Sequence, residues 1–356
     1  MISFGSVHTY LIRTRLLCLL GGLLLWSNTA AAQSAMFSQY YFSPMNVNPA
    51  LLGASSHSMV GVQHRSQWRN LDYPHQASML SIVKPVNLSK PAQQTGGVGL
   101  SLVNESVGTN RFYRAFGIHL GAAYNLSLDR KRNQLISFGL QGGFTQRRLN
   151  PSQLRWGSQY DPGVGYNPEI APSVGLLSDQ VGFASFSAGV VYYYNPSREL
   201  LLRRLSGFTG FSVSNLNRPY SSFYQADQTR TARVLRWHSG LEIPLSTSAK
   251  LQPQLLAAYK DTQQYHINVG TYLHYSPSRN KEESVQLMTG AWYRWNDSWV
   301  ASAGVSYQRY LLAVSYDFNT QPVAVHAFRG GAFEVSLAYR WFTKNRTLRN
   351  FSTPMI

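Results

Sequence analysis

The chain has 356 residues, of which only 13% are charged while another 13% are aromatic, and its formal net charge is +17. A soluble domain has about 25% charged residues, so this composition does not favour a soluble enzyme or a soluble binding domain. After residue 33 no stretch approaches the ~20 consecutive apolar residues that a membrane helix needs. The remaining class is a membrane protein whose strands close into a β-barrel with a lipid-facing side and a polar interior.

Residues 1–32 have the order of a secretory signal peptide. Arg13 and Arg15 precede the apolar run 16–26, and the three alanines 30–32 offer a cleavage site. The only cysteine, Cys18, lies inside the apolar run, so cleavage leaves a mature chain without cysteine and without a disulfide framework or thiolate metal site. The alternative, a buried N-terminal helix of a cytosolic protein, agrees less well with this order of residues.

Residues 33–57 form an N-terminal periplasmic or plug segment before the first predicted strand. The aromatic run Tyr40–Phe42 is large enough that it should be buried against something. Asn48-Pro49 and Gly53 impose a fixed turn shortly before the strand begins. Two interpretations stay open: the segment closes the periplasmic mouth of the barrel, or it docks to a periplasmic subunit.

In a series of segments between residues 58 and 342, most cleanly in the last third of the chain, apolar side chains recur at every second position, which is the period of a strand with two different faces. The last segment shows the alternation clearly, with Phe333, Val335, Leu337 and Tyr339 on one side and Glu334, Ser336 and Arg340 on the other. We expect the first group to face lipid and the second to face the lumen. Aromatic residues near the ends of the apolar rows are typical of the girdles that contact lipid headgroups.

The alternation predicts fourteen strands, an even number, as a single-chain bacterial barrel requires. The predicted strands are 58–68, 75–85, 95–107, 111–127, 132–147, 181–195, 204–215, 229–245, 248–260, 264–276, 283–294, 297–308, 309–319 and 331–342. The predicted fold class is therefore all-β: a transmembrane, antiparallel, up-and-down β-barrel of about 14 strands over residues 58–342, with a C-terminal tail over 343–356.

The connections and the basic residues are distributed unevenly along this barrel. If both termini are periplasmic, the long connections 148–180, 216–228 and 320–330 face outside, which is the asymmetry that outer-membrane barrels show. Basic residues gather at the opposite, periplasmic rim: Arg130, Lys131, Arg132, Arg198, Arg203, Arg204, Arg279, Lys281, Lys344, Arg346 and Arg349. Such a rim could hold an acidic partner protein or lipid phosphates. The alternative is a solvated collar of turn residues.

Known catalytic and cofactor-binding signatures are absent from the sequence. His266 and His274 are eight positions apart on one predicted strand, hence roughly 26 Å apart at ~3.3 Å per residue, and cannot share a metal ion. Asp161-Pro162 is typical of a turn, with a calcium or ligand role for Asp161 or Glu169 as the alternative. We expect no enzymatic activity, no cofactor, no metal and, because the signal peptide directs the chain to the periplasm, no nucleic-acid partner. A barrel phospholipase remains the enzymatic alternative, although no set of residues stands out for it.

The segment after the signal peptide contains the pattern Q-Y-x-x-x-P-x-x-x-N-P-A-x-x-G, formed by Gln39, Tyr40, Pro44, Asn48, Pro49, Ala50 and Gly53. This pattern resembles the opening of the PorP/SprF family, the outer-membrane barrels of the type IX secretion and gliding system of Bacteroidetes. Further resemblances follow in order at Arg65-x-Gln67-Trp68, Gly99-Leu100-Ser101 with Val103-Asn104, Ser315-Tyr316-Asp317-Phe318, and Gly330-Gly331 with Glu334 and 337–339. Residues 74–77 and the tail after residue 342 depart from the family.

The resemblance implies a non-enzymatic outer-membrane component of type IX protein secretion, which assists export or surface retention of a secreted cargo or adhesin that has a C-terminal signal domain. Its implied partners are outer-membrane lipid, the cargo at the external loops, and a periplasmic secretion-system subunit at the basic rim. The candidate partner-binding residues are Gln39, Tyr40, Pro44, Asn48, Pro49, Gly53, Arg65, Trp68, Arg130, Lys131 and Arg132.

The alternative function is a passive porin-like channel or a small-solute transporter. A wide polar lumen without a plug would favour the channel. A lumen closed by Tyr and Arg side chains and by the N-terminal segment would favour the secretion component, because a barrel of fourteen strands must be filled if it is not to leak.

Overall fold

The fold is known from a computed structural model, which describes residues 37–54, 57–69, 73–86, 95–130, 133–170, 178–195, 205–224, 229–262, 264–277, 285–320 and 331–341. The predicted signal peptide and the predicted C-terminal tail therefore lie outside the described residues. All described residues belong to one compact unit, Ala35–Ile356.

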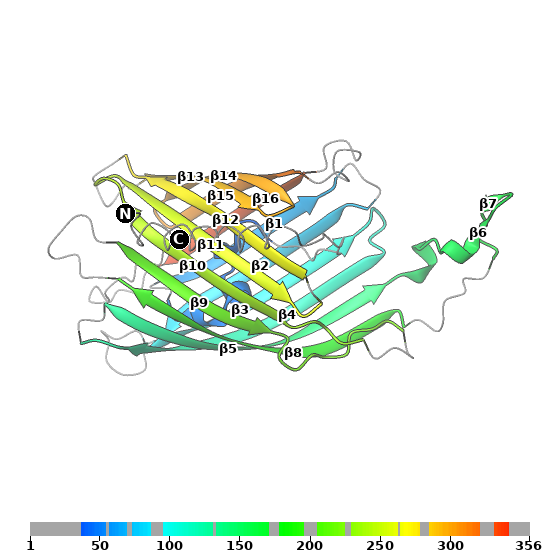
Figure 1. The fold of residues 1–356 in the computed structure, drawn as a ribbon, viewed down its shortest axis with the longest axis horizontal. Helices are drawn as coiled ribbons and strands as arrows, with labels where there is room; N and C mark the ends of the chain where they lie inside the picture. Colours follow the sequence, from blue (N-terminus) through cyan, green and yellow to red (C-terminus); the bar gives the residue numbers. More distant parts are fainter. Residues whose placement is uncertain are drawn as a thin grey trace, which may run out of the picture. The chain divides into compact units, whose positions relative to one another are not determined.

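Within the described residues, fourteen antiparallel strands close into one barrel, as the alternation of the sequence predicts (Figure 1). The barrel strands are β1 (Ser58–Gln67), β2 (His75–Val86), β3 (Gly96–Val107), β4 (Tyr113–Ser127), β5 (Gln134–Leu149), β8 (Gln180–Tyr194), β9 (Ser206–Ser214), β10 (Val234–Pro244), β11 (Ala249–Lys260), β12 (Gln264–Tyr275), β13 (Val285–Arg294), β14 (Ser298–Tyr307), β15 (Tyr310–Asn319) and β16 (Ala332–Trp341). Each strand pairs with its neighbours along the chain, and β1 pairs with β16 to close the barrel.

The observed strand boundaries agree with the predicted ones to within two residues, with one exception. Strand β10 begins at Val234 and not near residue 229, because residues 229–233 belong to the preceding loop. There Thr231 N donates to Pro219 O at 2.8 Å, and Tyr220 forms an isolated bridge with Arg230. Pairing within the loop thus satisfies backbone groups for which the sequence predicts a place in the barrel.

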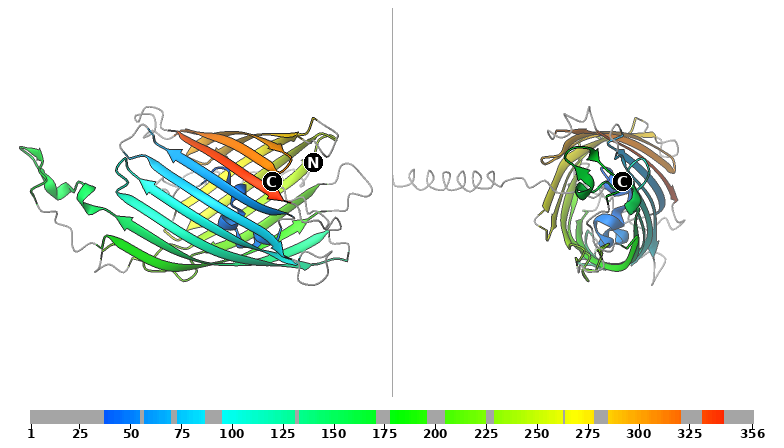
Figure 2. Two further views of the ribbon diagram at one scale, coloured as in Figure 1. Left: turned by 180° about the vertical axis from the view of Figure 1, so that it is seen from behind. Right: turned by 90° about the vertical axis from the view of Figure 1, so that its right-hand side faces the viewer.

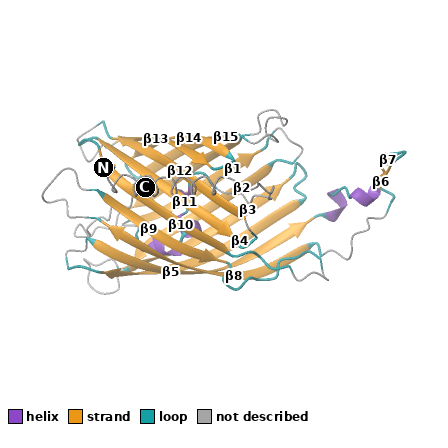
Figure 3. Cartoon of the chain, in the orientation of Figure 1, coloured by secondary structure: helices purple, strands orange, loops and turns teal. Residues whose placement is uncertain are grey.

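The long connection between β5 and β8 contains secondary structure that the sequence analysis did not predict. Two short 3-10 helices, η3 (Pro151–Gln153) and η4 (Gly157–Gln159), precede a small hairpin of β6 (Tyr160–Asp161) and β7 (Gly165–Tyr166). These elements are drawn beyond the barrel strands in Figure 3. Asp161 closes the hairpin turn, because its carboxylate accepts hydrogen bonds from Gly163 N at 2.7 Å and Val164 N at 3.2 Å.

The predicted register of the last strand is confirmed. In β16 the side chains of Phe333 and Leu337 are 40% and 47% exposed, whereas Glu334 and Ser336 are fully buried inside the barrel. Aromatic pairs lie near both ends of the outer surface, as expected for headgroup girdles. Tyr293 and Trp299 are 4.5 Å apart between ring centroids, and at the opposite end of the strands Tyr310 and Tyr339 are 5.1 Å apart.

The two ends of the barrel differ in their connections. We name the end with the β5–β8, β9–β10 and β15–β16 connections the loop end, and the other end the turn end. In outer-membrane barrels the long loops are extracellular, so the loop end faces outside. Of the predicted basic rim, Arg130 is described and is exposed at the turn end. The other members lie outside the described residues: Lys131, Arg132, Arg198, Arg203, Arg204, Arg279, Lys281, Lys344, Arg346 and Arg349.

The described part of the chain contains no helix that is both long enough and apolar enough to cross a bilayer.

The register predicts how a charge on the outer surface affects the barrel. We expect Leu337→Arg, at the middle of β16, to lower the free energy of unfolding by roughly 2–4 kcal/mol, and Phe333→Arg, near the strand end, by only about 0–1 kcal/mol. The cost arises because only the first charge is held within the hydrocarbon. Urea unfolding from lipid vesicles measures both values, and equal losses at the two positions would show that the lipid-facing band is misplaced.

Candidate functional site

The lumen of the barrel is occupied by residues 37–54, which we name the plug. The plug consists of three short helical turns, η1 (Tyr40–Phe42), α2 (Pro44–Val47) and η2 (Pro49–Gly53). Each plug residue except Asn46 is buried. Figure 2 shows these turns inside the ring of strands when the barrel is viewed along its length. The part of the predicted N-terminal segment that the structure describes, residues 37–54, thus lies within the lumen.

The sequence of the plug explains its local structure. Proline occupies the first position of both α2 and η2, where a missing N–H costs nothing and the fixed φ suits a helical turn. Asn48 precedes η2, and its side-chain oxygen accepts a hydrogen bond from Ala50 N at 2.9 Å. These short turns leave many backbone groups without partners of their own, so the barrel wall must supply them.

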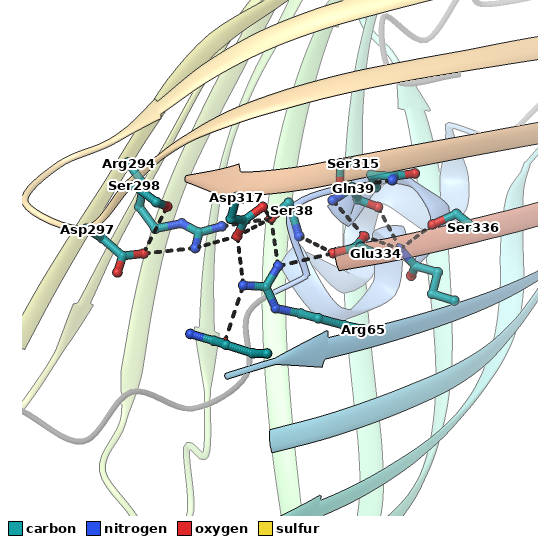
Figure 4. A network of polar contacts seen from close by, with 12 residues as sticks. Ser38, Gln39, Arg65, Arg294, Asp297, Ser298, Ser315, Asp317, Glu334 and Ser336 are labelled. Atoms are coloured by element: carbon teal, nitrogen blue, oxygen red, sulfur yellow. Dashed lines mark hydrogen bonds and ion pairs between the residues drawn. The ribbon is translucent and has the colours of Figure 1, made fainter. Parts of the chain in front are cut away.

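Towards the loop end, a single carboxylate holds the start of the plug (Figure 4). Glu334 of β16 points into the lumen and accepts hydrogen bonds from two consecutive backbone groups, Ser38 N at 2.8 Å and Gln39 N at 3.0 Å. Hydrogen bonds to an ionised acceptor are roughly twice as strong as neutral ones. From β1, Gln63 Nε2 donates to Gln39 O at 2.8 Å. The backbone of the plug is therefore bound from two adjacent strands.

The hydroxyl of Ser38 lies at the centre of a buried charged network. It donates to Asp317 Oδ1 at 2.9 Å and accepts from Arg65 Nη1 at 2.9 Å and Arg294 Nη2 at 3.0 Å. One small side chain of the plug thus contacts charges from β1, β13 and β15 together. Figure 4 shows these side chains converging on Ser38 from separate strands.

The charges of this network also pair with each other. Arg65 lies 2.7 Å from Asp317 and 3.5 Å from Glu334, while Arg294 lies 2.9 Å from Asp297 and 3.3 Å from Asp317. All five side chains are buried, so two cations face three carboxylates out of bulk water. A buried charge is stable only when paired and hydrogen-bonded. There is one more carboxylate than there are cations. The backbone N–H groups of Ser38 and Gln39 help to stabilise the excess negative charge by donating to Glu334.

In the middle of the lumen, the plug packs through its aromatic side chains. The Tyr40 ring meets Trp292 edge to face with centroids 5.7 Å apart, and its hydroxyl donates to Gln254 Oε1 at 2.9 Å. The hydroxyl of Tyr41 forms a hydrogen bond with that of Tyr272, and their rings are 5.0 Å apart. Burial raises the pKa of both plug tyrosines, so the two phenols stay protonated and can donate.

Towards the turn end, wall side chains bind the backbone carbonyls of the plug. Ser212 Oγ donates to Val47 O at 2.6 Å, Ser137 Oγ to Ala50 O at 2.7 Å, and Asn125 Nδ2 to Gly53 O at 2.6 Å. These three donors come from β9, β5 and β4. Each donor binds a buried carbonyl, which would be costly without a hydrogen-bond partner.

Asn48 joins the plug to the wall in a second way. Its side-chain nitrogen lies 3.1 Å from Val190 O and 3.0 Å from Phe211 O, so the amide reaches the backbones of two adjacent strands. The ring nitrogen Nε2 of His238 lies 3.0 Å from the same atom. The residue that caps η2 therefore also fixes the depth of the plug against β8, β9 and β10.

Glycines on the inner surface make room for this close approach. A Cβ atom at Gly139 would overlap Ala50 N, one at Gly189 would overlap the Asn48 side chain, and one at Gly97 would overlap Leu52 O. Glycine is the residue that allows a backbone or side chain to come so near a strand. The shape of the wall is thus matched to the plug along its length.

The structure brings most of the predicted site residues together. Gln39, Tyr40, Pro44, Asn48, Pro49, Gly53 and Arg65 all lie in the plugged lumen, buried against each other or the wall. Trp68 lies in the β1–β2 connection, where its N–H donates to Gly331 O at 3.2 Å. Arg130 is exposed at the turn end, and Lys131 and Arg132 lie outside the described residues.

Sequence reasoning did not assign a role to Ser38, Arg294, Asp297, Asp317 or Glu334. Their signal was present, because Arg294, Asp317 and Glu334 are charged residues at inward positions of strands whose inner faces are mostly uncharged. A buried charge on an inner strand face needs a partner, and that rule alone would have marked them. For Asp161 and Glu169, the described residues contain no group of three His, Cys, Asp or Glu side chains placed to hold a metal ion.

A recess remains beside the plug near the turn end. It is lined by Tyr41, His274, Gln286, Met288, Ser306, Leu311 and Arg340, and leaves about 10 Å³ for the centre of a water molecule. That space holds about one water. The recess is thus too small for a solute.

These features define an outer-membrane β-barrel whose lumen is filled by its own N-terminal segment. A family model described as "Type IX secretion system membrane protein PorP/SprF" matches residues 29–339, nearly the whole chain. The chain belongs to this family and is a membrane component of type IX secretion in the outer membrane. No curated protein sequence matches it.

Several solved structures share the barrel fold at low sequence identity. A Pseudomonas aeruginosa FadL homologue is 12% identical over 82% of this chain and 92% of its own, with a TM-score of 0.45. The Pseudomonas putida toluene transporter TodX is 10% identical over 87% of this chain and 94% of its own, with a TM-score of 0.47. These likenesses concern the fold alone.

The buried network predicts a large effect from a small change. We expect Asp317→Asn to lower the free energy of unfolding by about 3–5 kcal/mol, because buried Arg65 loses the carboxylate 2.7 Å away and buried Arg294 loses the one 3.3 Å away. The control is Asp261→Asn, whose partner Arg218 lies 3.6 Å away in an exposed pair and whose loss should cost about 0–1 kcal/mol. Urea unfolding followed by tryptophan fluorescence compares them, and similar losses would contradict the structural role of the network.

Proposed function

We propose that this barrel is a non-enzymatic component of type IX secretion that assists export of a secreted cargo or adhesin, or retains it at the cell surface. The observation that supports the proposal most directly is the filled lumen. Because residues 37–54 occupy the interior from the charged network to the turn end, the surfaces left for partners are the two ends of the barrel and its outer wall.

The loop end is the surface that we assign to the cargo. Long loops on a rigid barrel are where recognition surfaces are usually located. Here the β5–β8 connection presents exposed aromatic and apolar side chains, with Tyr160 packed on Tyr166 at 5.7 Å and Val164 81% exposed at the hairpin tip. The Arg155 guanidinium lies 5.0 Å from the centroid of the Tyr166 ring. Aromatic and arginine side chains are the types that dominate binding energy at protein interfaces.

The loops at this end also support each other. Ser178 N, just before β8, donates to Phe223 O in the β9–β10 loop at 2.7 Å, and the Phe223 ring meets Tyr113 of β4 with centroids 6.5 Å apart. A loop held by contacts of this kind loses less conformational entropy when it binds a partner. The β9–β10 loop therefore suits a docking surface for a secreted protein.

The turn end is the surface that we assign to an acidic periplasmic subunit. Arg130 is exposed there, and the sequence places Lys131 and Arg132 directly after it. A group of like charges in solvent attracts an acidic partner over a range set by the Debye length, about 8 Å at physiological ionic strength. Binding at this rim should therefore weaken as the salt concentration rises.

The alternative function, a passive channel, would require the plug to leave the lumen. Its exit would break the hydrogen bonds of Ser38 and Gln39 to Glu334 and leave the charges of the network without their plug partners. Leaving buried charged groups unsatisfied is costly. The filled lumen therefore weighs against a channel and in favour of the secretion component.

The proposal predicts that two kinds of variant lose different partners. Replacing residues 155–170 with a short Gly/Ser linker should release the secreted cargo from the cell surface but keep the periplasmic subunit. Charge reversal of Arg130, Lys131 and Arg132 to Glu should do the opposite. Affinity purification from outer membranes with identification of co-purifying proteins measures both outcomes. The charge-matched control for the rim variant reverses three exposed arginines at the loop end, Arg69→Glu, Arg111→Glu and Arg233→Glu.

Assembly of each variant is checked first by the heat-dependent shift of folded barrels on gel electrophoresis. If the linker variant and the rim variant assembled normally yet lost the same partner, the division between the two ends would be wrong. If both kept every partner, neither surface would have the proposed role.

A further inference from the structure

The outer wall near the loop end has an unusual row of polar side chains. The register aligns Ser106 of β3 with Arg114 of β4, Arg114 with Arg148 of β5, and Arg148 with Gln180 of β8. All four side chains point outwards, because they share the strand faces of the exposed residues Val98, Leu120, Leu140 and Phe186. The row is thus continuous over four adjacent strands.

From this row towards the turn end, the outer wall becomes steadily less polar. The next row towards the turn end is Asn104, Phe116, Gln146 and Gly182, and the one after it is Leu102, Ile118, Phe144 and Ala184. The third row, with Leu100, Leu120, Gly142 and Phe186, is entirely apolar or small. A surface that passes from apolar to charged within two rows marks the boundary between hydrocarbon and headgroups.

The two arginines of this row are directly opposite each other. Residues paired in this way have Cβ atoms about 4.5–5.5 Å apart, and like charges so placed are destabilising. Both side chains are exposed. The ion pairs among the described residues are those of Arg65, Arg218, Lys250 and Arg294, so neither Arg114 nor Arg148 has a carboxylate partner there. An external anion between the two guanidinium groups would remove the repulsion.

We propose that Arg114 and Arg148, with Ser106 and Gln180 beside them, bind the phosphate groups of the phosphorylated glycolipid that forms the outer leaflet. Guanidinium groups bind phosphate through paired hydrogen bonds, and the flanking hydroxyl and amide add neutral donors. The acyl chains would lie along the apolar rows with Ile118, Leu120 and Phe144. The loop end faces outside, so the lipid within reach is that of the outer leaflet.

The geometry of the strands agrees with one headgroup reaching both arginines. Neighbouring strands are about 4.8 Å apart, and strands in such barrels are tilted by about 35–45°. Paired positions on adjacent strands therefore differ in height by only about 3 Å, which a flexible arginine side chain spans easily. Gln146 in the row below donates to Gln180 at 3.3 Å, which fixes the polar edge of the site beside Arg148.

Native mass spectrometry of the full-length barrel in detergent tests the proposal. The probes are bisphosphorylated lipid A, the same lipid after removal of both phosphates, phosphatidylglycerol and inorganic phosphate. The test variant is Arg114→Gln with Arg148→Gln. The control is Arg69→Gln with Arg233→Gln, which removes two exposed arginines at the same end of the barrel but away from the row.

We expect the test variant to bind bisphosphorylated lipid A about tenfold more weakly than the unaltered barrel, since two charge-assisted contacts are lost. The control should bind it unchanged. The dephosphorylated lipid should bind the unaltered barrel and the test variant equally weakly. Replacement of both arginines by Lys, which keeps the charges, should restore part of the affinity.

Three results would overturn the proposal. Equal binding of bisphosphorylated lipid A by the test variant and the unaltered barrel would show that the row does not bind it. An equal loss in the control would show a general effect of net charge. Binding of phosphatidylglycerol or inorganic phosphate as strong as that of lipid A, and equally dependent on the two arginines, would assign the site to phosphate in general and not to the outer-leaflet glycolipid.

Discussion

The contact on which the rest of the structure depends is the pair of hydrogen bonds from Ser38 N and Gln39 N to the Glu334 carboxylate. A peptide inside a barrel has many backbone groups that water no longer reaches, and each must find a partner in the wall. Glu334 supplies two of them and joins the plug to Arg65 and Asp317. The wall and the plug therefore stabilise each other, and neither is complete alone.

This mutual dependence explains the composition of the inner wall. Serine and asparagine side chains of several strands bind plug carbonyls, and Gly97, Gly139 and Gly189 allow the plug to come near the strands. The composition of the outer wall has a different cause. Its side chains are apolar along most of the height of the barrel, where they contact lipid, and polar at the loop end, where they contact the leaflet surface. A filled interior then leaves function to the ends and the outside of the barrel, as the proposed role in secretion requires.

The alternation of apolar and polar residues was sufficient to predict the fold. Successive side chains of a strand point to opposite faces, so a strand between lipid and a polar lumen must have apolar residues at every second position. It predicted the strand number and the register of β16. It did not reveal the plug contacts, because Ser38 meets Asp317 only after the barrel closes, at a separation of 279 positions. The short motifs contain Asp317 and Glu334, and also Gln39 and Arg65, but a motif does not indicate which of these residues pair. Residues 229–233 were misassigned because loop pairing satisfies the same backbone groups as a strand.

The central claim, that residues 37–54 close the barrel, is tested most directly by conductance in planar lipid bilayers. The unaltered protein should show no steady current. Gly139→Leu, which overlaps the plug backbone, should produce discrete openings, whereas Gly142→Leu on the outer face of the same strand, where the nearest atoms belong to Phe186, should stay closed. Large, stable openings in the unaltered protein, or the same behaviour in the two glycine variants, would contradict the account.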